Sequence, residues 1–296
     1  MSVAVVTDST AYLPSELVEG YGILVVPLYV VLPGRSGREG LDVAPEDVAR
    51  ALSVRGQTVS TSRPTPGDFL AAYRRALDEG ADQIVSVHLS GELSSTSEAA
   101  RVAASQVGEH IVTVVDSRTA AMGTGFAVLA AARSAAAGAD AEEVAETARR
   151  TAAQTSTFFV VDTLEHLRRG GRIGAAAAVL GSALAVKPVL HVKDGRVVPL
   201  EKVRTAARAN NRLVQRAVDA AGEGPVSVAV HHLAAAERAE HLAAELRERL
   251  PALRELHVSE LGAAIGAHVG PGAVGVVIAP FWQETDDEDG RGSSDE

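Results

Sequence analysis

Short β-branched runs alternate with helical segments along the first half of the chain, and this order constrains the fold more than any other feature. Residues 3–6, 83–89 and 110–116 are expected strands, and helical patterns lie between and after them. Such an alternation is typical of an open, largely parallel sheet with flanking helices. The sequence therefore predicts an α/β fold for this half, with ligands at the carboxyl ends of the strands.

Local patterns predict the remaining elements of the first half. Residues 23–32 are mostly apolar and are expected to form one strand, whereas 45–56 and 67–80 are expected helices. Residues 58–66 are rich in hydroxyls and contain two prolines, so we expect an exposed loop there. A helix over 141–154 is expected to end this half.

The second half carries antiparallel signals. Residues 188–203 are expected to form a hairpin with Asp194-Gly195 as its tight turn, because these residue types tolerate positive φ angles. A helix over 205–222, a strand over 225–233, a helix over 235–250 and a strand over 255–261 are expected next, followed directly by a final strand over 273–281. The pattern predicts an α+β domain with antiparallel strands.

The length of 296 residues is sufficient for two domains, each with its own core. We expect an N-terminal α/β domain over 1–156 and a C-terminal α+β domain over 157–283. The remaining residues, 284–296, are polar and acidic and have the composition of a disordered tail.

Composition excludes several classes of site. The chain contains no cysteine, which rules out disulfides, thiol nucleophiles and cysteine-type zinc sites. Its net charge of −10 argues against general nucleic-acid binding. The first residues lack a basic segment followed by an apolar stretch, so we find no secretory signal and expect a cytoplasmic protein.

Residues 163–188 change from a cationic glycine turn to an uncharged apolar run. The run at 175–186 is shorter than the roughly 20 apolar residues that a membrane span needs, so a buried helix or helix pair is the better interpretation. A core helix with a cationic start is the simpler alternative. The turn contains three arginines and three glycines, namely Arg168, Arg169, Arg172, Gly170, Gly171 and Gly174.

Common catalytic motifs are missing from the sequence. It contains neither the G-x-S-x-G nucleophile elbow nor a Walker A pattern. Residues 270–275 match G-x-G-x-x-G, but a strand is expected after them, where the dinucleotide motif requires a helix. His231 and His232 are adjacent on an expected strand and point to opposite faces, so we expect no metal site there.

Hydroxyl-rich loops follow the expected strands. Thr61, Ser62 and Ser94 can donate hydrogen bonds to a carboxylate without bringing a charge into a dry site. Each can instead be an ordinary helix cap. Together with the apolar run, these loops favour binding of an amphipathic anion over bond cleavage.

Two competing functions use other features. A small α/β phosphotransferase or hydrolase would use Asp8 and Asp116 at strand ends and would depend on a metal ion. The D-x-D spacing of an aspartyl nucleophile is absent, because Ser9 and Thr10 follow Asp8. An interaction module with an incidental cavity is the third interpretation.

Five sequence blocks occur in a fixed order: VAVVTDSTAYLP, TSRPTPGDF, SGELSSTSEAA, TLEHLRRGGRIG with GSALAVKPVL and a later KVR, and GAHVGPGAVGV. Together they resemble the DegV family of bacterial fatty-acid-binding proteins, in which a lipid lies between two α/β domains. The resemblance runs from about residue 3 to residue 281. The chain departs from the usual family pattern at Arg63, where glutamine is common, and at Ser95, where glycine is common.

The resemblance implies a role for several side chains. The fatty-acid carboxylate would bind Thr61, Ser62 and Ser94, and His268 would join them from the second domain. Supporting contacts would come from Ser90, Gly91 and Thr96. The acyl chain, for example of palmitate or oleate, would lie in a tunnel lined by Ala176, Val179, Leu180 and Leu184.

The resemblance also implies a partner. A separate fatty acid kinase would phosphorylate the bound lipid to an acyl phosphate, and the lipid-binding protein would itself be non-catalytic. Arg172 and Arg204 match positions that would dock this kinase, which places the arginine turn on the outside of the protein. No cofactor, metal, nucleic acid or stable membrane insertion is expected.

Overall fold

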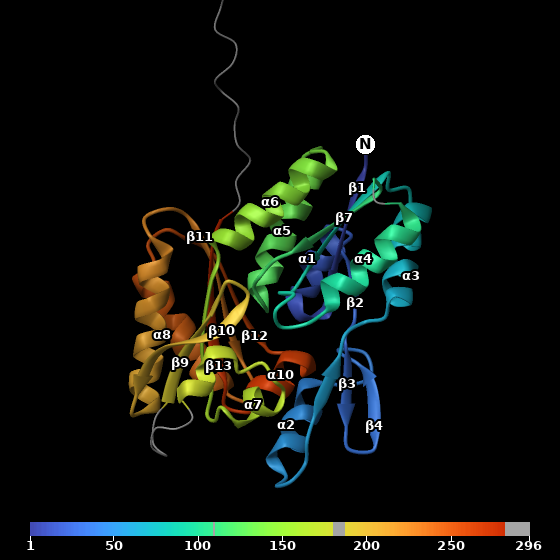
Figure 1. Cartoon of the computed structure of the whole chain (residues 1–296). Coiled ribbons are helices and arrows are strands. Elements are labelled where there is room, and N and C mark those ends of the chain that lie inside the picture. Colours follow the sequence, from blue (N-terminus) through green and yellow to red (C-terminus); the bar gives the residue numbers. More distant parts are fainter. Residues whose placement is uncertain (109, 180–186, 282–296) are drawn as a thin grey trace, which may run out of the picture.

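The computed structural model describes residues 1–108, 110–179 and 187–281, and its first half contains a parallel sheet (Figure 1). Four strands pair in the order β2-β1-β6-β7, all parallel, which confirms the predicted α/β fold. The strands are β1 (Val3–Asp8), β2 (Leu24–Val26), β6 (Gln83–His88) and β7 (Val112–Asp116). The helices of this half are α1 (Ser15–Gly20), α3 (Pro66–Asp78), α4 (Thr96–Val107), α5 (Met122–Ala136) and α6 (Ala141–Gln154), with a short 3-10 turn η1 (Ser9–Ala11).

A second, smaller antiparallel sheet leaves the first one at Pro27. Its strands are ordered β4-β3-β5, with β3 (Tyr29–Leu32), β4 (Arg35–Arg38) and β5 (Ser60–Ser62), and α2 (Pro45–Ser53) follows β4. The prediction of one strand over 23–32 is therefore wrong: Pro27 has no N–H to continue the ladder, and the chain changes sheets there. The expected loop over 58–66 is also corrected, because β5 pairs with β3.

The second half forms a six-stranded mixed sheet in the order β10-β9-β8-β13-β11-β12. All neighbouring pairs are antiparallel except β11 with β12. Positive φ angles at Asp194 (51°) and Gly195 (82°) form the predicted turn between β9 and β10. The strands are β8 (Ser156–Val160), β9 (Lys187–Lys193), β10 (Arg196–Val203), β11 (Val226–His232), β12 (Leu253–Glu260) and β13 (Val274–Pro280).

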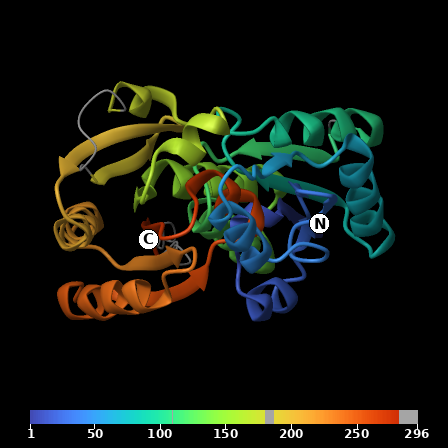
Figure 2. The same cartoon turned by 90° about the horizontal axis from the view of Figure 1, so that it is seen from below.

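Helices of the second half fall into two groups. The long helices α8 (Ala206–Ala221) and α9 (Ala236–Arg249) bury their apolar faces against the mixed sheet. The short helices α7 (Glu165–Arg169) and α10 (Ala263–Val269) contact each other, and the 3-10 segment η2 (Gly174–Val179) packs on β10. Helix α10 lies toward the first half of the chain, where it contacts α2, and Figure 2 shows the two side by side.

The two halves share buried surfaces. Helices α5 and α6 cover one face of the parallel sheet and also pack on Val277 and Ala279 of β13. The small sheet and α2 pack on Ala263, Ala264 and Ala267 of α10. The boundary predicted near 156 falls at the first residue of β8. The predicted tail over 284–296 lies outside the described residues.

Candidate functional site

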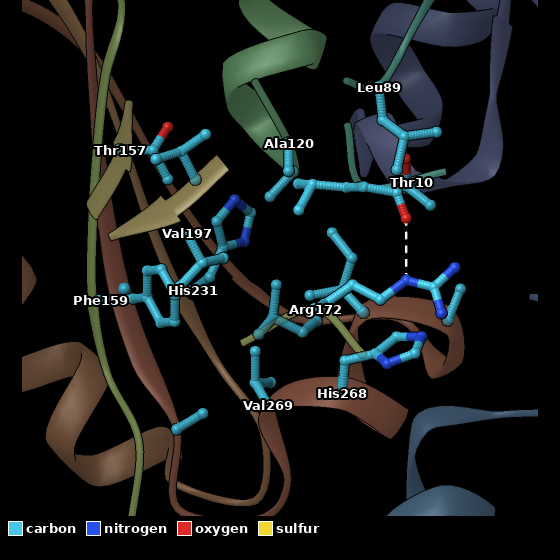
Figure 3. A pocket seen from close by; sticks show the side chains of 18 of the residues that line it. Thr10, Leu89, Ala120, Thr157, Phe159, Arg172, Val197, His231, His268 and Val269 are labelled. Atoms are coloured by element: carbon cyan, nitrogen blue, oxygen red, sulfur yellow. Dashed lines mark hydrogen bonds between the residues drawn. The ribbon is translucent and has the colours of Figure 1, made fainter. Parts of the chain in front are cut away.

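A cavity lies between the two halves of the chain (Figure 3). Its walls come mainly from the loop after β6, the residues just before α5, strands β5, β8 and β13, and helix α10. Of the 28 described residues that line it, 18 are apolar and none is acidic. Such a cavity can hold an apolar chain, and the missing negative charge favours an anionic end group over a cationic one.

The polar groups predicted for a carboxylate lie together at this cavity. Thr61 and Ser62 on β5, Ser94 in the loop after β6, and His268 on α10 all line it. Thr61 Oγ1 and His268 Nε2 share a hydrogen bond of 2.8 Å across 207 residues of sequence. The packing of the small sheet on α10 creates this contact, because β5 belongs to that sheet.

The His268 ring is uncharged near neutral pH. Burial, followed by the positive charge of Arg172, lowers the pKa of His268 to about 4. Its Nδ1 atom is buried and has no hydrogen-bond partner among the described residues. The ring lies against Gly170, where an added Cβ would come within 2.1 Å of Nδ1. Gly170 therefore provides the space that His268 occupies.

Helix α10 is fixed by residues from the first half. The Glu39 carboxylate accepts a 2.7 Å hydrogen bond from the Ala264 N–H, and the Tyr12 hydroxyl accepts one of 3.1 Å from Ile265. Burial raises the pKa of Glu39, and Ser9 and Tyr12 donate hydrogen bonds to its carboxylate. These contacts hold the first turn of the helix that carries His268, and no local sequence signal predicted them.

Arg172 corrects one prediction. The arginine turn was expected on the outside of the protein, but Arg172 is half-buried and lines the cavity. Its Nε donates to the Leu93 carbonyl at 2.9 Å and its Nη1 to the Gly170 carbonyl at 2.6 Å. The glycine turn brings the side chain back toward the cavity. Arg204, by contrast, is exposed.

Comparison with known proteins identifies the family. The model of the DegV family, described as "Uncharacterised protein, DegV family", matches residues 2–280. The chain belongs to the DegV family. A DegV domain-containing protein of Streptomyces coelicolor is 55% identical over 277 residues, which cover 94% of this chain and 98% of that protein.

Solved DegV structures share the fold. A DegV family protein from Thermus thermophilus, described by its fatty acid binding, is 37% identical with a TM-score of 0.90 and covers 95% of this chain and 100% of its own. DegV from Bacillus subtilis, described as a fatty acid binding protein, is 33% identical with a TM-score of 0.86 and the same coverage.

Arg63 and Ser95, the two residues that were expected to depart from the DegV pattern, lie together. Arg63 Nη1 donates to the Ser95 carbonyl at 3.4 Å and lies 3.8 Å from a carboxylate oxygen of Glu98. Arg63 lines the cavity, whereas Ser95 is exposed and does not. Of these two residues, only Arg63 therefore places a side chain at the cavity.

The supporting residues expected from the DegV pattern do not line the cavity. Ser90 is buried, and its hydroxyl donates to the Gly195 carbonyl at 2.8 Å, which joins the loop after β6 to the β9–β10 turn. The Gly91 N–H donates to Asp116. Thr96 is buried, and its hydroxyl lies 2.8 Å from that of Ser94. Thr96 can orient Ser94, but Ser90 and Gly91 stabilise the loop.

The apolar walls differ from those expected. Ala176 is buried in a cluster with cavity residues such as Leu167 and Val197, but it is not among the described residues that line the cavity. The side chain of Val179 and the whole of Leu180 and Leu184 lie outside the described residues. Most described wall residues instead come from strands and from α10, for example Phe159, Val274, Ile265 and Val269.

His231 is a cavity residue that the sequence did not indicate as such. Its Nε2 accepts a 3.2 Å hydrogen bond from the Met122 N–H, and its Nδ1 lies 3.1 Å from the Ser259 hydroxyl. Burial lowers its pKa to about 4, so the ring is neutral. With both nitrogens engaged, His231 adds no charge to the cavity. The sequence feature that could have indicated this position is a histidine within an otherwise apolar strand.

The strand-end aspartates are engaged in structural contacts. Asp8 is fully buried and accepts hydrogen bonds from Thr10, from His88 and from the Leu89 N–H. Asp116 accepts from two backbone N–H groups in its own and a neighbouring loop. Within the described part of the chain, no three His, Cys, Asp or Glu residues form a group that could hold a metal ion. The same part has no helix long and apolar enough for a membrane span.

Proposed function

We propose that this chain binds one long-chain fatty acid, with its carboxylate at Thr61, Ser62, Ser94 and His268 and its acyl chain along the apolar walls of the cavity. The observation that carries this proposal is the gathering of uncharged donors at a cavity whose described lining contains no acidic residue. The descriptions of the Thermus thermophilus and Bacillus subtilis relatives as fatty acid binding support it.

The acyl chain supplies most of the affinity. Burial of a methylene group contributes roughly 0.8 kcal/mol, so sixteen carbons give on the order of 12 kcal/mol before the ordering of the lipid is subtracted. Hydroxyl donors orient the carboxylate, because each charge-assisted hydrogen bond depends on direction as well as charge. Palmitate and oleate are therefore suitable ligands for a first test.

We further propose that the bound lipid is presented to a separate fatty acid kinase, which forms the acyl phosphate, and that this chain catalyses no step itself. The exposed Arg204 is suited to docking an acidic partner surface. Arg204→Glu should abolish acyl phosphate formation by an added fatty acid kinase while the lipid stays bound. Unchanged turnover with this variant would remove Arg204 from the docking surface.

Thermal unfolding of delipidated protein tests the binding site. Added palmitate or oleate should raise the melting temperature of the wild type, because a ligand of the native state stabilises it. Ser94→Ala removes one charge-assisted hydrogen bond, so it should weaken binding roughly 10- to 100-fold. Ser95→Ala is the matched control, since the Ser95 side chain is exposed and outside the cavity. Equal binding by both variants would contradict the assignment of Ser94.

A further inference from the structure

The buried carboxylate of Glu39 joins segments that are far apart in the sequence. Glu39 follows β4 and is 5% exposed. Its carboxylate accepts hydrogen bonds from the hydroxyls of Ser9 and Tyr12 and, across 225 residues of sequence, from the Ala264 N–H. All three donors are uncharged, so hydrogen bonds from the loop after β1 and from α10 stabilise the buried negative charge. Loss of the carboxylate would remove the contact between these segments.

The helix that Glu39 contacts forms part of the cavity in Figure 3. Ala264, the donor to Glu39, and the next residue, Ile265, both line that cavity. His268 lies about one turn further along the same helix. Because α10 spans only seven residues, a shift of its first turn would also move the His268 ring away from Thr61.

Tyr12 links the same carboxylate to two wall residues of the cavity. Its hydroxyl donates to Glu39 and accepts a hydrogen bond of 3.1 Å from the Ile265 N–H. Its ring meets the imidazole of His231 edge to face, with 6.1 Å between the ring centroids. Ile265 and His231 both line the cavity. A displaced Tyr12 would therefore affect the cavity wall at two points.

The network also reaches the cavity through Leu28 in the first half of the chain. Leu28 lies between β2 and β3 and lines the cavity. Its N–H donates to the Ser9 hydroxyl at 3.0 Å, and its carbonyl accepts a 2.8 Å hydrogen bond from the Glu39 N–H. Glu39 is not among the described lining residues, but its hydrogen bonds connect wall residues from both halves.

Glu39 stands between this cavity and a second one. The second cavity is lined by Glu39 and, among others, by Gly262 and Ala263, whereas the flanking Leu261 and Ala264 line the first cavity. Residues 261–264 therefore form a thin wall with a cavity on each side. Packing alone fixes such a wall poorly, because atoms that face a cavity have few partners to hold them. The hydrogen bonds of Glu39 supply the missing restraint.

We propose that Glu39 is a positioning residue for the fatty-acid site: its carboxylate holds the first turn of α10 against the first half of the chain, so that His268 stays within hydrogen-bond reach of Thr61. The inference rests on the proposed fatty-acid binding and extends it to a residue behind the cavity wall. Glu39→Gln tests it with little change in shape, because an amide has one acceptor oxygen where this carboxylate uses two.

Glu255 provides a matched control. It also joins the two halves of the chain, because Arg133 of α5 donates to the Glu255 carboxylate on β12 at 3.1 Å. Its side chain is 18% exposed, and neither Glu255 nor Arg133 is among the described residues that line the cavity. Glu255→Gln therefore weakens a contact between the halves that involves neither α10 nor the described cavity lining.

The first measurement is calorimetric titration of delipidated protein with palmitate at pH 7.5. Glu39→Gln should weaken palmitate binding roughly tenfold, as expected when a displaced His268 loses one hydrogen bond to the carboxylate. Tyr12→Phe removes one hydroxyl of the same network and should weaken binding about threefold. Glu255→Gln should change the affinity less than about twofold, because a distant contact that shares no partner acts independently.

The second measurement is NMR titration of the His268 imidazole in the lipid-free protein. Burial, followed by the charge of Arg172, lowers the pKa of His268 to about 4. A displaced α10 exposes the ring, so this pKa should rise toward its usual value of about 6.5 in Glu39→Gln and stay near 4 in Glu255→Gln. A general loss of stability does not move this pKa, so the titration separates positioning from a purely structural role.

The outcomes are distinguishable. Unchanged palmitate affinity in Glu39→Gln, an equal loss in Glu39→Gln and Glu255→Gln, or an unchanged His268 pKa in Glu39→Gln would each overturn the inference. If Glu39→Gln does not fold, Tyr12→Phe decides, and an unchanged affinity or an unchanged His268 pKa in that variant would overturn it. Wild type that binds no palmitate would instead reject the proposed function, and the NMR titration would still decide whether Glu39 positions α10.

Discussion

Two pairs of a hydroxyl and a histidine in this protein have almost the same geometry and opposite surroundings. Ser86 Oγ lies 2.7 Å from His88 Nε2, and Thr61 Oγ1 lies 2.8 Å from His268 Nε2. The first pair continues to a carboxylate, because His88 Nδ1 lies 3.0 Å from Asp8. The second does not, because His268 Nδ1 has no partner among the described residues.

The comparison separates structure from binding. The Ser86–His88–Asp8 relay has the hydrogen-bond order of a hydrolytic triad, but all three side chains are fully buried and none lines the described cavity. The Thr61–His268 pair lines the cavity, but no carboxylate among the described residues accepts a hydrogen bond from its histidine. The order of the hydrogen bonds alone therefore does not indicate catalysis. A catalytic histidine must also be reachable from the cavity and be oriented by a carboxylate.

The largest expected effect is a loss of stability when the buried Ser86–His88–Asp8 relay is broken. Asp8→Ala leaves His88 and the buried N–H groups of Thr10 and Leu89 without their acceptor. We expect a loss of about 3–5 kcal/mol in the free energy of unfolding. Thr61→Ala, which removes the hydroxyl that pairs with His268, should lower the free energy of unfolding by about 1 kcal/mol. Urea denaturation measures both; equal losses would show that the two pairs do not differ in this way.

The pH dependence of stability should come partly from His268 of the Thr61–His268 pair. The pKa of His268 is about 4 in the folded protein and about 6.5 in the unfolded chain, so the unfolded state binds more protons between these values. Its contribution is complete above pH 6.5 and falls as the pH approaches 4, with about 2 kcal/mol lost between pH 7 and pH 5.

His268→Gln removes this titrating group from the Thr61–His268 pair. The difference in unfolding free energy between pH 7 and pH 5 should become smaller in the variant by that amount. His231, whose pKa is also lowered to about 4, should still contribute its own share. An unchanged pH dependence in His268→Gln would mean that its ring is not held neutral by burial.

A change at Gly170 should disturb the Thr61–His268 pair and leave the Ser86–His88 pair unchanged. The added methyl of Gly170→Ala would come within 2.1 Å of His268 Nδ1, so the ring must move away from Thr61. We expect palmitate binding to weaken roughly tenfold, by the loss of one hydrogen bond to a charged group. Gly224→Ala is the control, because a Cβ there meets no atom within 4 Å. Calorimetric titration of both variants decides the point.

The smallest expected effect lies outside both pairs. Arg196 and Glu92 form an exposed ion pair of 2.8 Å between the β9–β10 hairpin and the loop after β6. Arg196→Ala should change the unfolding free energy by less than about 1 kcal/mol and leave palmitate binding unchanged. A large loss of binding in this variant would show that the hairpin contact, and not the polar pair, controls the site.

The sequence predicted those parts of the molecule that local patterns determine. The parallel sheet, the helices after its strands and the Asp194-Gly195 turn follow from periodicity and turn chemistry. The grouping of Thr61, Ser94 and His268 followed from the DegV resemblance rather than from spacing, because the contact between Thr61 and His268 spans 207 residues.

Other features depended on tertiary packing. The small sheet begins where Pro27 interrupts an apolar run, and its packing on α10 has no local signal. The same packing explains why Glu39, far from α10 in sequence, caps that helix. Arg172 was expected on the outside of the protein but lines the cavity. The orientation of side chains in a glycine turn depends on backbone angles that the sequence does not determine.

Native mass spectrometry of the purified full chain tests the central claim most directly. Protein expressed in bacteria, or delipidated and then mixed with palmitate or oleate, should carry one fatty acid per chain, and lipid extraction should identify the same molecule. Protein that is purified empty and takes up neither added fatty acid would contradict the account.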